Sequence, residues 1–266
     1  MTSRILAALA AAASLTLVTS AIACSVTPDY RVPTNLELAE EAELVLLGRV
    51  VGEEKEAEFW KSSLLVEPVR AIKGKAPEGT ISITGARLDP PLAWGADGML
   101  SNPYELAEAH PDSYSGACLR RVFPRGTMAL FFLERAPDGE GWRPSGGPFS
   151  RWAEDVLSEE APWLMLTQLY VEVAAAPESA RKAMLEAERA ELAAMADDPV
   201  AQLIAADIAR QLAGPNETWH ETMAREIEAS RETREAVEAI EDAIGDVVGE
   251  APEPGLTQAD AMEDER

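Results

Sequence analysis

Apolar residues in the first half of the chain are spaced as in β-strands. Five stretches are rich in β-branched and apolar residues or alternate with period two, and they predict strands: 44–51, 64–72, 80–84, 127–133 and a short one around Trp142. Before them, Pro33-Thr34-Asn35 offers an N-cap for a helix over 36–43. Gly48 inside the first strand indicates a bulge or a sharp bend. About five strands in about 110 residues favour a small closed β-barrel.

Apolar residues in the second half recur at helical spacing instead. The pattern predicts four helices: 161–175, 178–196, 199–212 and 216–247. Asp198 and Pro199 mark the start of the third helix, Gly214 its end, and Asn216 is expected to cap the fourth. The stretch 230–235 has no apolar position, so there the fourth helix projects, bends or is only partly ordered. We expect 162–248 to fold alone, because its apolar stripes can bury one another.

The charge of the chain is strongly acidic and unevenly distributed. The formal net charge is −24, of which 24–150 carries −6 and 151–266 carries −19. A chain of this charge with no basic stripe repels phosphate backbones, which excludes nucleic-acid binding. Together with the strand and helix patterns, the charge distribution predicts an α+β fold in three parts. These are a barrel domain over 24–150, an acidic helical domain over 151–248 and a disordered acidic tail over 249–266.

The first 23 residues have the features of a secretory signal peptide. Arg4 supplies a positive charge, 5–18 is an almost unbroken apolar run, and Ala21 and Ala23 are the small residues of a cleavage site. No later stretch reaches the ~20 apolar residues that span a bilayer. We therefore expect an exported protein, periplasmic or extracellular.

Cleavage after Ala23 would leave Cys24 as the first mature residue, and two chemistries are open for it. In one, Cys24 pairs with Cys118, the only other cysteine, in an oxidising compartment. In the other, Cys24 is the lipid-bearing cysteine of a bacterial lipoprotein, although Ala21 replaces the leucine usual at that signal. Contact with a membrane is expected only in the second case, which would leave Cys118 as a single thiol.

Several short strings resemble the netrin-like family, which contains the tissue inhibitors of metalloproteinases and bacterial relatives. These are the exported Cys24, the string 42–50, Ile72-Lys73-Gly74 and Gly116-Ala117-Cys118 ahead of an aliphatic strand. The resemblance covers about 24–133 and implies a five-stranded OB-like barrel with Cys24 joined to Cys118. In the animal inhibitors the amino group and carbonyl of the first cysteine bind a protease zinc, and a second cysteine follows two positions later. This chain has Val26 there, so that double-cysteine wedge is absent.

A long insertion over 85–117 separates the third strand from Cys118. It is rich in proline, glycine, aspartate and aromatic residues, and loops of this length are usually functional or mobile. Its aromatic residues Trp94, Tyr104 and Tyr114 are candidates for anchoring a partner. The alternative is that they only pack the insertion against the barrel. His110 has no ligand partner nearby in the sequence and is expected at the surface.

No catalytic motif is present in the sequence. The string His220-Glu221 begins like a zinc-protease helix, but Ala224 occupies the second ligand position. We expect neither a metal nor a cofactor, since the chain has only two histidines and two cysteines. The sequence favours an exported, non-enzymatic binding protein whose partner is an unidentified protein, such as an envelope protein or a metalloprotease. The alternative is a structural interaction protein of the envelope that acts through its helices.

Overall fold

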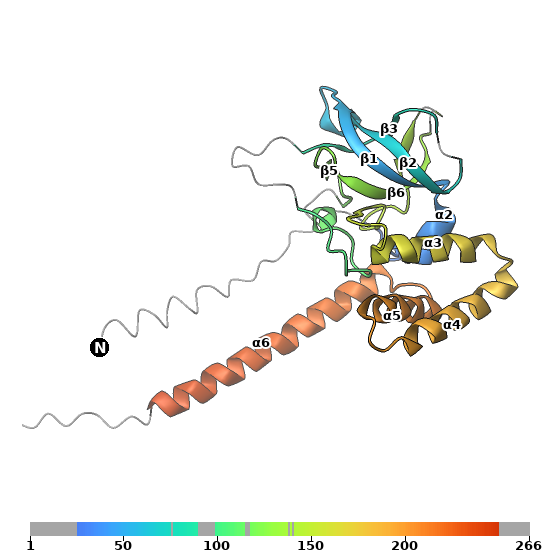
Figure 1. Cartoon of the computed structure of the whole chain (residues 1–266). Helices are drawn as coiled ribbons and strands as arrows, with labels where there is room; N and C mark the ends of the chain where they lie inside the picture. Colours follow the sequence, from blue (N-terminus) through green and yellow to red (C-terminus); the bar gives the residue numbers. More distant parts are fainter. Residues whose placement is uncertain are drawn as a thin grey trace, which may run out of the picture. The chain divides into compact units, whose positions relative to one another are not determined.

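The chain is described here by a computed structural model that covers 26–75, 77–89, 99–114, 118–137, 139 and 141–249. The first half is a closed five-stranded β-barrel, drawn in blue to green in Figure 1. Its strands, in the order in which they pair, are β1 (Leu44–Glu54), β2 (Ser63–Lys73), β3 (Ile81–Thr84), β7 (Trp142–Pro144) and β6 (Met128–Arg135). The pairing of β1 with β6 closes the barrel.

The topology of the barrel is OB-like. Strands β1, β2 and β3 form an antiparallel meander, β3 pairs in parallel with β7, and β6 returns to β1. The register of β1 on β2 shifts between Leu47 and Gly48, as the sequence predicts for Gly48. A Cβ on Gly48 would lie 2.4 Å from Cγ1 of Val66, so only glycine allows the strands to approach at this bulge. The predicted α+β fold with an N-terminal OB-like barrel is confirmed.

Strands β1 and β6 are buried on both faces, which explains their continuous apolar sequences. Leu44, Leu46 and Phe131 point into the barrel, where they pack with Trp142 and Trp152. Because side chains alternate along a strand, the neighbours on the other face belong to a second cluster. Those neighbours are Val45, Leu47, Leu130 and Phe132.

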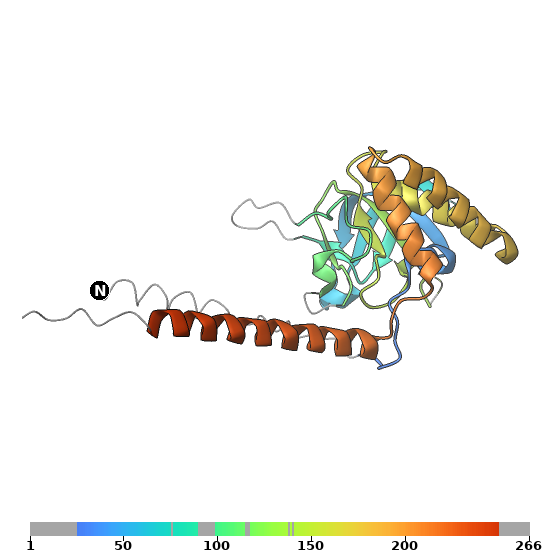
Figure 2. The ribbon, with the colours of Figure 1, turned by 90° about the horizontal axis from the view of Figure 1, so that it is seen from below.

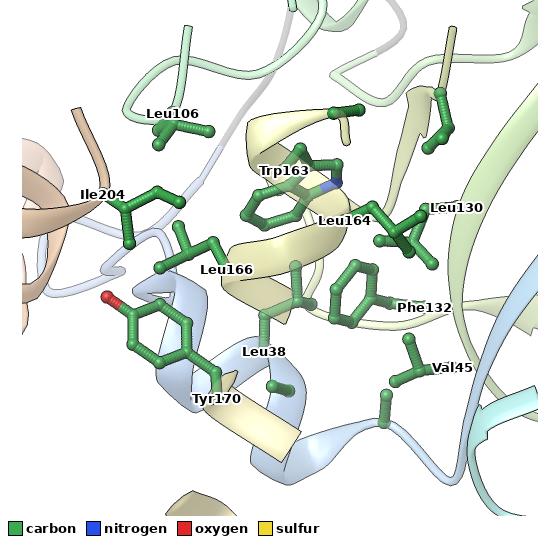
Figure 3. Close-up of a cluster of buried hydrophobic side chains, with 14 of the residues drawn as sticks. Leu38, Val45, Leu106, Leu130, Phe132, Trp163, Leu164, Leu166, Tyr170 and Ile204 are labelled. Carbon is green, nitrogen blue, oxygen red and sulfur yellow. The ribbon is translucent and has the colours of Figure 1, made fainter. Parts of the chain in front are cut away.

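The second cluster joins the barrel to a layer of helices. The helices are α2 (Asn35–Glu41), α3 (Pro162–Ala175), α4 (Glu178–Ala194) and α5 (Pro199–Ala213). Figure 3 shows Phe132 and Leu130 of β6 facing Leu164 of α3, with Leu38 of α2 beside them. Helices α4 and α5 lie side by side in Figures 1 and 2. One apolar cluster therefore includes residues from the barrel and from all four helices.

Short elements lie outside the barrel order. Strand β8 (Ala153–Asp155) pairs with β6, and β4 (Arg87–Leu88) pairs in parallel with β5 (Val122–Phe123). Two turns of 3-10 helix cover Phe59–Lys61 and Pro111–Tyr114. The sequence did not predict β8, which lies beyond residue 150 even though Trp152 and Ala153 belong to the barrel cluster. The structure does not test the predicted division into two domains at residue 150.

By backbone contacts the chain divides elsewhere, after Trp219. The second unit contains most of helix α6 (Trp219–Gly249). This helix is continuous through 230–235, where we expected it to project, to bend or to be only partly ordered. Within the described residues no helix is both long and apolar enough to cross a membrane.

Helix boundaries were predicted well where a cap is encoded. Asp198 caps α5 by accepting hydrogen bonds from the N–H groups of Val200 and Ala201, and Thr34 forms a capping box with Glu37. The predicted cap at Asn216 is wrong, because α6 begins at Trp219 and the Asn216 side chain donates to the carbonyl of Val32 (2.9 Å). The predicted signal peptide 1–23 lies outside the described residues, and so does the predicted tail 249–266 apart from Gly249, which is the last residue of α6.

Candidate binding site

The candidate site is the part of the insertion that the structure describes, 99–114, together with Cys118. Tyr104 and Tyr114 are 63% and 42% exposed, and Cys118 is disulfide-bonded. Trp94 and Cys24 lie outside the described residues, so the role of Trp94 and the pairing of Cys24 with Cys118 stay predictions.

Segment 99–114 is held from below by two consecutive acidic residues of β8. Ser101 and Asp155 bond reciprocally: the Ser101 N–H donates to Oδ2 of Asp155 (2.6 Å), and the Asp155 N–H donates to Oγ of Ser101 (3.0 Å). Glu154 accepts from Oγ of Ser101 (2.6 Å) and from the N–H of His110 (3.0 Å). All four residues are buried. Two points of the insertion, nine residues apart, are thus fixed to one strand.

A buried ion pair joins Arg120 to Asp155 of strand β8. Both oxygens of Asp155 accept from Nη2 of Arg120, at 2.9 and 3.0 Å, and both side chains are almost fully buried. The guanidinium also lies 4.4 Å over the ring of Phe123. Removing either charge would leave the other buried without its partner, which is strongly destabilising.

Arg151 links the insertion to helix α3. Its guanidinium lies 4.4 Å over the ring of Trp163, and its Nη1 donates to the carbonyl of Glu108 (2.5 Å). Its Nη2 is 3.9 Å from Glu154 Oε2. Arg151 and Glu154 therefore act on neighbouring parts of 99–114, from positions that the sequence assigned to the helical domain.

His110 is buried, so the prediction that it lies at the surface is wrong. Its Nδ1 accepts from the N–H of Asp112 (3.1 Å), which places the proton on Nε2, and Nε2 donates to the carbonyl of Met99 (3.0 Å). Burial and the nearby Arg120 lower the pKa of His110 below its usual 6.5, against the opposing effects of Met99, Glu154 and Asp155. Both ring nitrogens are used to fold the loop, so His110 is a structural residue.

A second buried polar group holds the middle of the segment from the helices. The carbonyl of Leu106 accepts from Nδ2 of Asn35 (2.7 Å) and from Nη2 of Arg210 (2.9 Å). Asp207 of α5 accepts from the same two side chains and from the hydroxyl of Tyr170 (2.6 Å). The desolvation that accompanies burial, together with the Asp207 charge, raises the pKa of Tyr170. Helices α2 and α5 thus meet the insertion at one backbone carbonyl, and Tyr170 of α3 bonds the Asp207 carboxylate that accepts from both donors.

Three aromatic rings are stacked beside Cys118. The ring of Phe149 is stacked with Tyr114 (5.6 Å between centroids) and with Trp219 (4.8 Å). The Tyr114 hydroxyl donates to Glu108 (2.7 Å). Burial and this carboxylate raise the pKa of Tyr114. Tyr114 is therefore fixed in orientation while part of its ring stays exposed.

The described charged groups around segment 99–114 are engaged in holding its backbone. Within the described residues, no three His, Cys, Asp or Glu side chains gather as a metal site. The buried charges are paired with each other and with the backbone of 99–114. These contacts therefore fix the backbone of segment 99–114 and leave Tyr104 and Tyr114 exposed at its surface.

The sequence singled out the two tyrosines, whose role in binding stays a prediction, and it missed the residues that position segment 99–114. The missed residues are charged and lie in stretches of sequence that are typical of an exposed surface, and no motif marks them: Arg120, Arg151, Glu154 and Asp155. Comparisons of the chain with protein-family models, curated proteins and solved structures found no match.

Proposed function

We propose that this chain is an exported, non-enzymatic binding protein that holds a protein partner through Tyr104 and Tyr114 of segment 99–114, which we call the rim of the barrel. The observation that carries the proposal is that the backbone of segment 99–114 is held by buried side chains of other elements. Hydrogen bonds from β8, α2 and α5 hold its backbone at Ser101, Leu106 and His110, while both tyrosine rings remain exposed.

A fixed loop with exposed tyrosines has two advantages in binding. Tyrosine rings bury a large area on contact and lose few rotatable bonds, which is why they are frequent among the residues that dominate binding energy. A loop that is already ordered loses little further conformational entropy when a partner binds. The buried ion pair of Arg120 and Asp155 therefore supports binding indirectly, by ordering the loop beforehand.

The netrin-like assignment is part of this proposal. It is supported by the OB-like strand order, by helix α2 directly before β1, and by a disulfide-bonded cysteine shortly before β6. Export is supported by the leader sequence 1–23. A metalloprotease is one partner class to test, and there the free amino group of a mature Cys24 would be the zinc-binding group.

Affinity capture with the mature protein tests the proposal. The bait is offered to an envelope extract of the organism that makes it, and captured proteins are quantified by mass spectrometry for the wild type and for Tyr104→Ser and Tyr114→Ser. We expect each substitution to reduce capture of the partner by at least tenfold. Trp60→Ser is the matched control, because Trp60 is an exposed aromatic residue on the hairpin between β1 and β2, outside the insertion. Equal capture by all variants would overturn the proposal.

The inhibitor form of the proposal needs a separate assay. Mature protein is titrated against purified zinc metalloproteases, with and without one extra residue ahead of Cys24. If inhibition depends on the amino group, the extra residue abolishes it, because the amine is then moved away from the zinc. Inhibition that survives the extra residue would exclude this mechanism. Absence of any inhibition would exclude the tested metalloproteases as partners of this protein.

A second candidate function is supported by helix α6. Two of its described apolar residues, Ile227 and Ile240, are 70% and 59% exposed, as expected for a helix that contacts another protein. In this case the helical region makes the contact and the barrel only positions it. A chain that ends at Trp219 and loses the partner, while both tyrosine variants keep it, would favour this candidate.

A further inference from the structure

The first residue of α6 is fixed by the segment that precedes α2. The N–H of Trp219 donates to the carbonyl of Tyr30 (2.6 Å), and Thr218 forms an isolated β-bridge with Arg31. The side chain of Asn216 donates to the carbonyl of Val32. Residues 30–32 therefore hold the chain at 216–219, where α6 begins.

The same position is held a second time, by an aromatic stack. The indole ring of Trp219 lies 4.8 Å from the Phe149 ring, with only 2° between the ring planes. Phe149 is buried and is also stacked with Tyr114. Its loop is fixed to the segment before α2 as well, because the Tyr30 hydroxyl donates to the carbonyl of Pro148 (2.6 Å). The position of Phe149 thus decides whether Trp219 has a ring to stack on.

The backbone of Phe149 depends on Cys118. The Phe149 N–H donates to the Cys118 carbonyl at 2.6 Å. Among the described residues these are the two non-glycine positions with positive φ, at 60° and 61°. A left-handed backbone is unfavourable for a residue with a side chain, so each needs contacts that hold it there. For Cys118 the covalent constraint is its disulfide bond.

We propose that Cys118 and Phe149 form a redox-sensitive clamp on the first residue of α6. While the disulfide is intact, Cys118 keeps its left-handed backbone, Phe149 stays in place and Trp219 is stacked. Reduction by a dithiol breaks the S–S bond: two electrons and two protons pass to the sulfurs, one of which becomes the Cys118 thiol, and the dithiol becomes a disulfide. Cys118 is then free to relax, and the ring of Phe149 withdraws from Trp219.

The clamp would make the position of Trp219 depend on the compartment. Disulfides persist in oxidising compartments and are rare where thiols are kept reduced. In a reducing compartment Trp219 would be loosely held, and after oxidation it would be fixed. This inference rests on the disulfide and the stack and does not depend on the proposed binding function.

Hydrogen exchange on the full chain tests the clamp. Exchange is measured by mass spectrometry for the oxidised protein and for the protein reduced with dithiothreitol. On reduction we expect amides at 216–222 to exchange at least tenfold faster, while amides of β1 and β6 around Leu46 and Phe131 keep their rates. Unchanged exchange at 216–222 would overturn the clamp. An equal acceleration in the barrel would also overturn it, because the bond would then stabilise the whole unit.

A substitution of the ring shows whether the disulfide acts through Phe149. Oxidised Phe149→Ala should exchange at 216–222 like the reduced wild type, and reducing this variant should add less than a twofold change. Tyr104→Ala is the matched control, since it removes an exposed ring of the same rim outside the stack, and it should exchange like the wild type in both redox states. If reduction accelerates exchange equally in Phe149→Ala and in the wild type, the ring does not transmit the change and the clamp is excluded.

Discussion

Helix α5 buries the central residues of its apolar stripe, whereas two isoleucines in the described part of α6 are exposed. Ile208 of α5 is completely buried, while Ile227 and Ile240 of α6 are mostly accessible to solvent. Both stripes have the spacing of an amphipathic helix, and the sequence predicts both helices on that basis. The difference is that α5 meets an apolar cluster containing Leu166 and Tyr170 of α3. Periodicity therefore predicts a helix, but its burial depends on a complementary surface elsewhere in the chain.

Charged residues differ between the two regions in the same way. In the first unit Arg120 and Asp155 are buried and paired, and they hold a loop in place. On α6 Arg231 pairs with Glu228 and Glu235 one turn away on either side, all exposed to solvent. Such pairs support the helix on which they lie but are worth only a few tenths of a kcal/mol each. The same residue types thus determine tertiary structure in one unit and only local structure in the other.

The largest expected effect concerns the folding of the helices without the barrel. From the sequence, 162–248 should fold alone; the shared cluster leads us to expect the opposite. Trp163, Leu164 and Leu166 pack in one cluster with Phe132 of the barrel, and exposing each such side chain costs about 1.5–3 kcal/mol. The loss approaches the whole stability of a typical domain. Circular dichroism of 162–248 should therefore show no cooperative thermal melt.

The control for that experiment removes α6 instead. A mature chain ending at Trp219 keeps the described residues of both apolar clusters and should melt within a few degrees of the whole mature protein. A cooperative melt of 162–248 close to that of the whole protein would contradict the shared-core interpretation and support two independent domains.

The next effect compares a buried ion pair with an exposed one. Asp155→Asn leaves Arg120 buried without its countercharge and should cost about 3–5 kcal/mol of unfolding free energy. Glu228→Gln on α6 removes an exposed partner of Arg231 and should change that free energy by less than about 0.5 kcal/mol. Urea denaturation followed by tryptophan fluorescence measures both. Similar midpoints for the two variants would show that the buried pair does not hold the insertion.

A matched pair of isoleucines tests the comparison directly. Ile208→Ala should destabilise the protein by about 2–5 kcal/mol, because it leaves a cavity in the shared cluster. Ile227→Ala, at an exposed position of α6, should change the stability by less than about 0.5 kcal/mol. The same urea titrations apply. A large loss for Ile227→Ala would mean that α6 buries this face in solution, for example against a second protein.

Much of the barrel and of the helix boundaries could be predicted because their signals are local. Gly48 marked the bulge, and Asp198 with Gly214 marked both ends of α5. Strand β8 could not be predicted, since Glu154 and Asp155 are buried only because Ser101, His110 and Arg120 reach them from distant parts of the sequence. For the same reason the sequence predicted a surface position for His110, whose burial depends on Met99, Asp112 and Glu154 together. The sequence singled out Tyr104 and Tyr114 because aromatic residues in a long loop are a local signal, and their role in binding stays a prediction.

The smallest expected effect is the dependence of stability on pH through His110. Burial and Arg120 lower its pKa in the folded state below the usual 6.5. The unfolded state therefore binds a proton more readily, so stability is complete above about pH 6.5 and falls as the pH decreases below it. The physical cause is the burial of the imidazole, to which the charge of Arg120 adds; protonation of Nδ1 would also remove the acceptor of the Asp112 N–H. Urea midpoints of the wild type and of His110→Gln, measured from pH 8 to pH 5, should show a steeper decline for the wild type. A slope unaltered by His110→Gln would mean that carboxylates alone set the pH dependence.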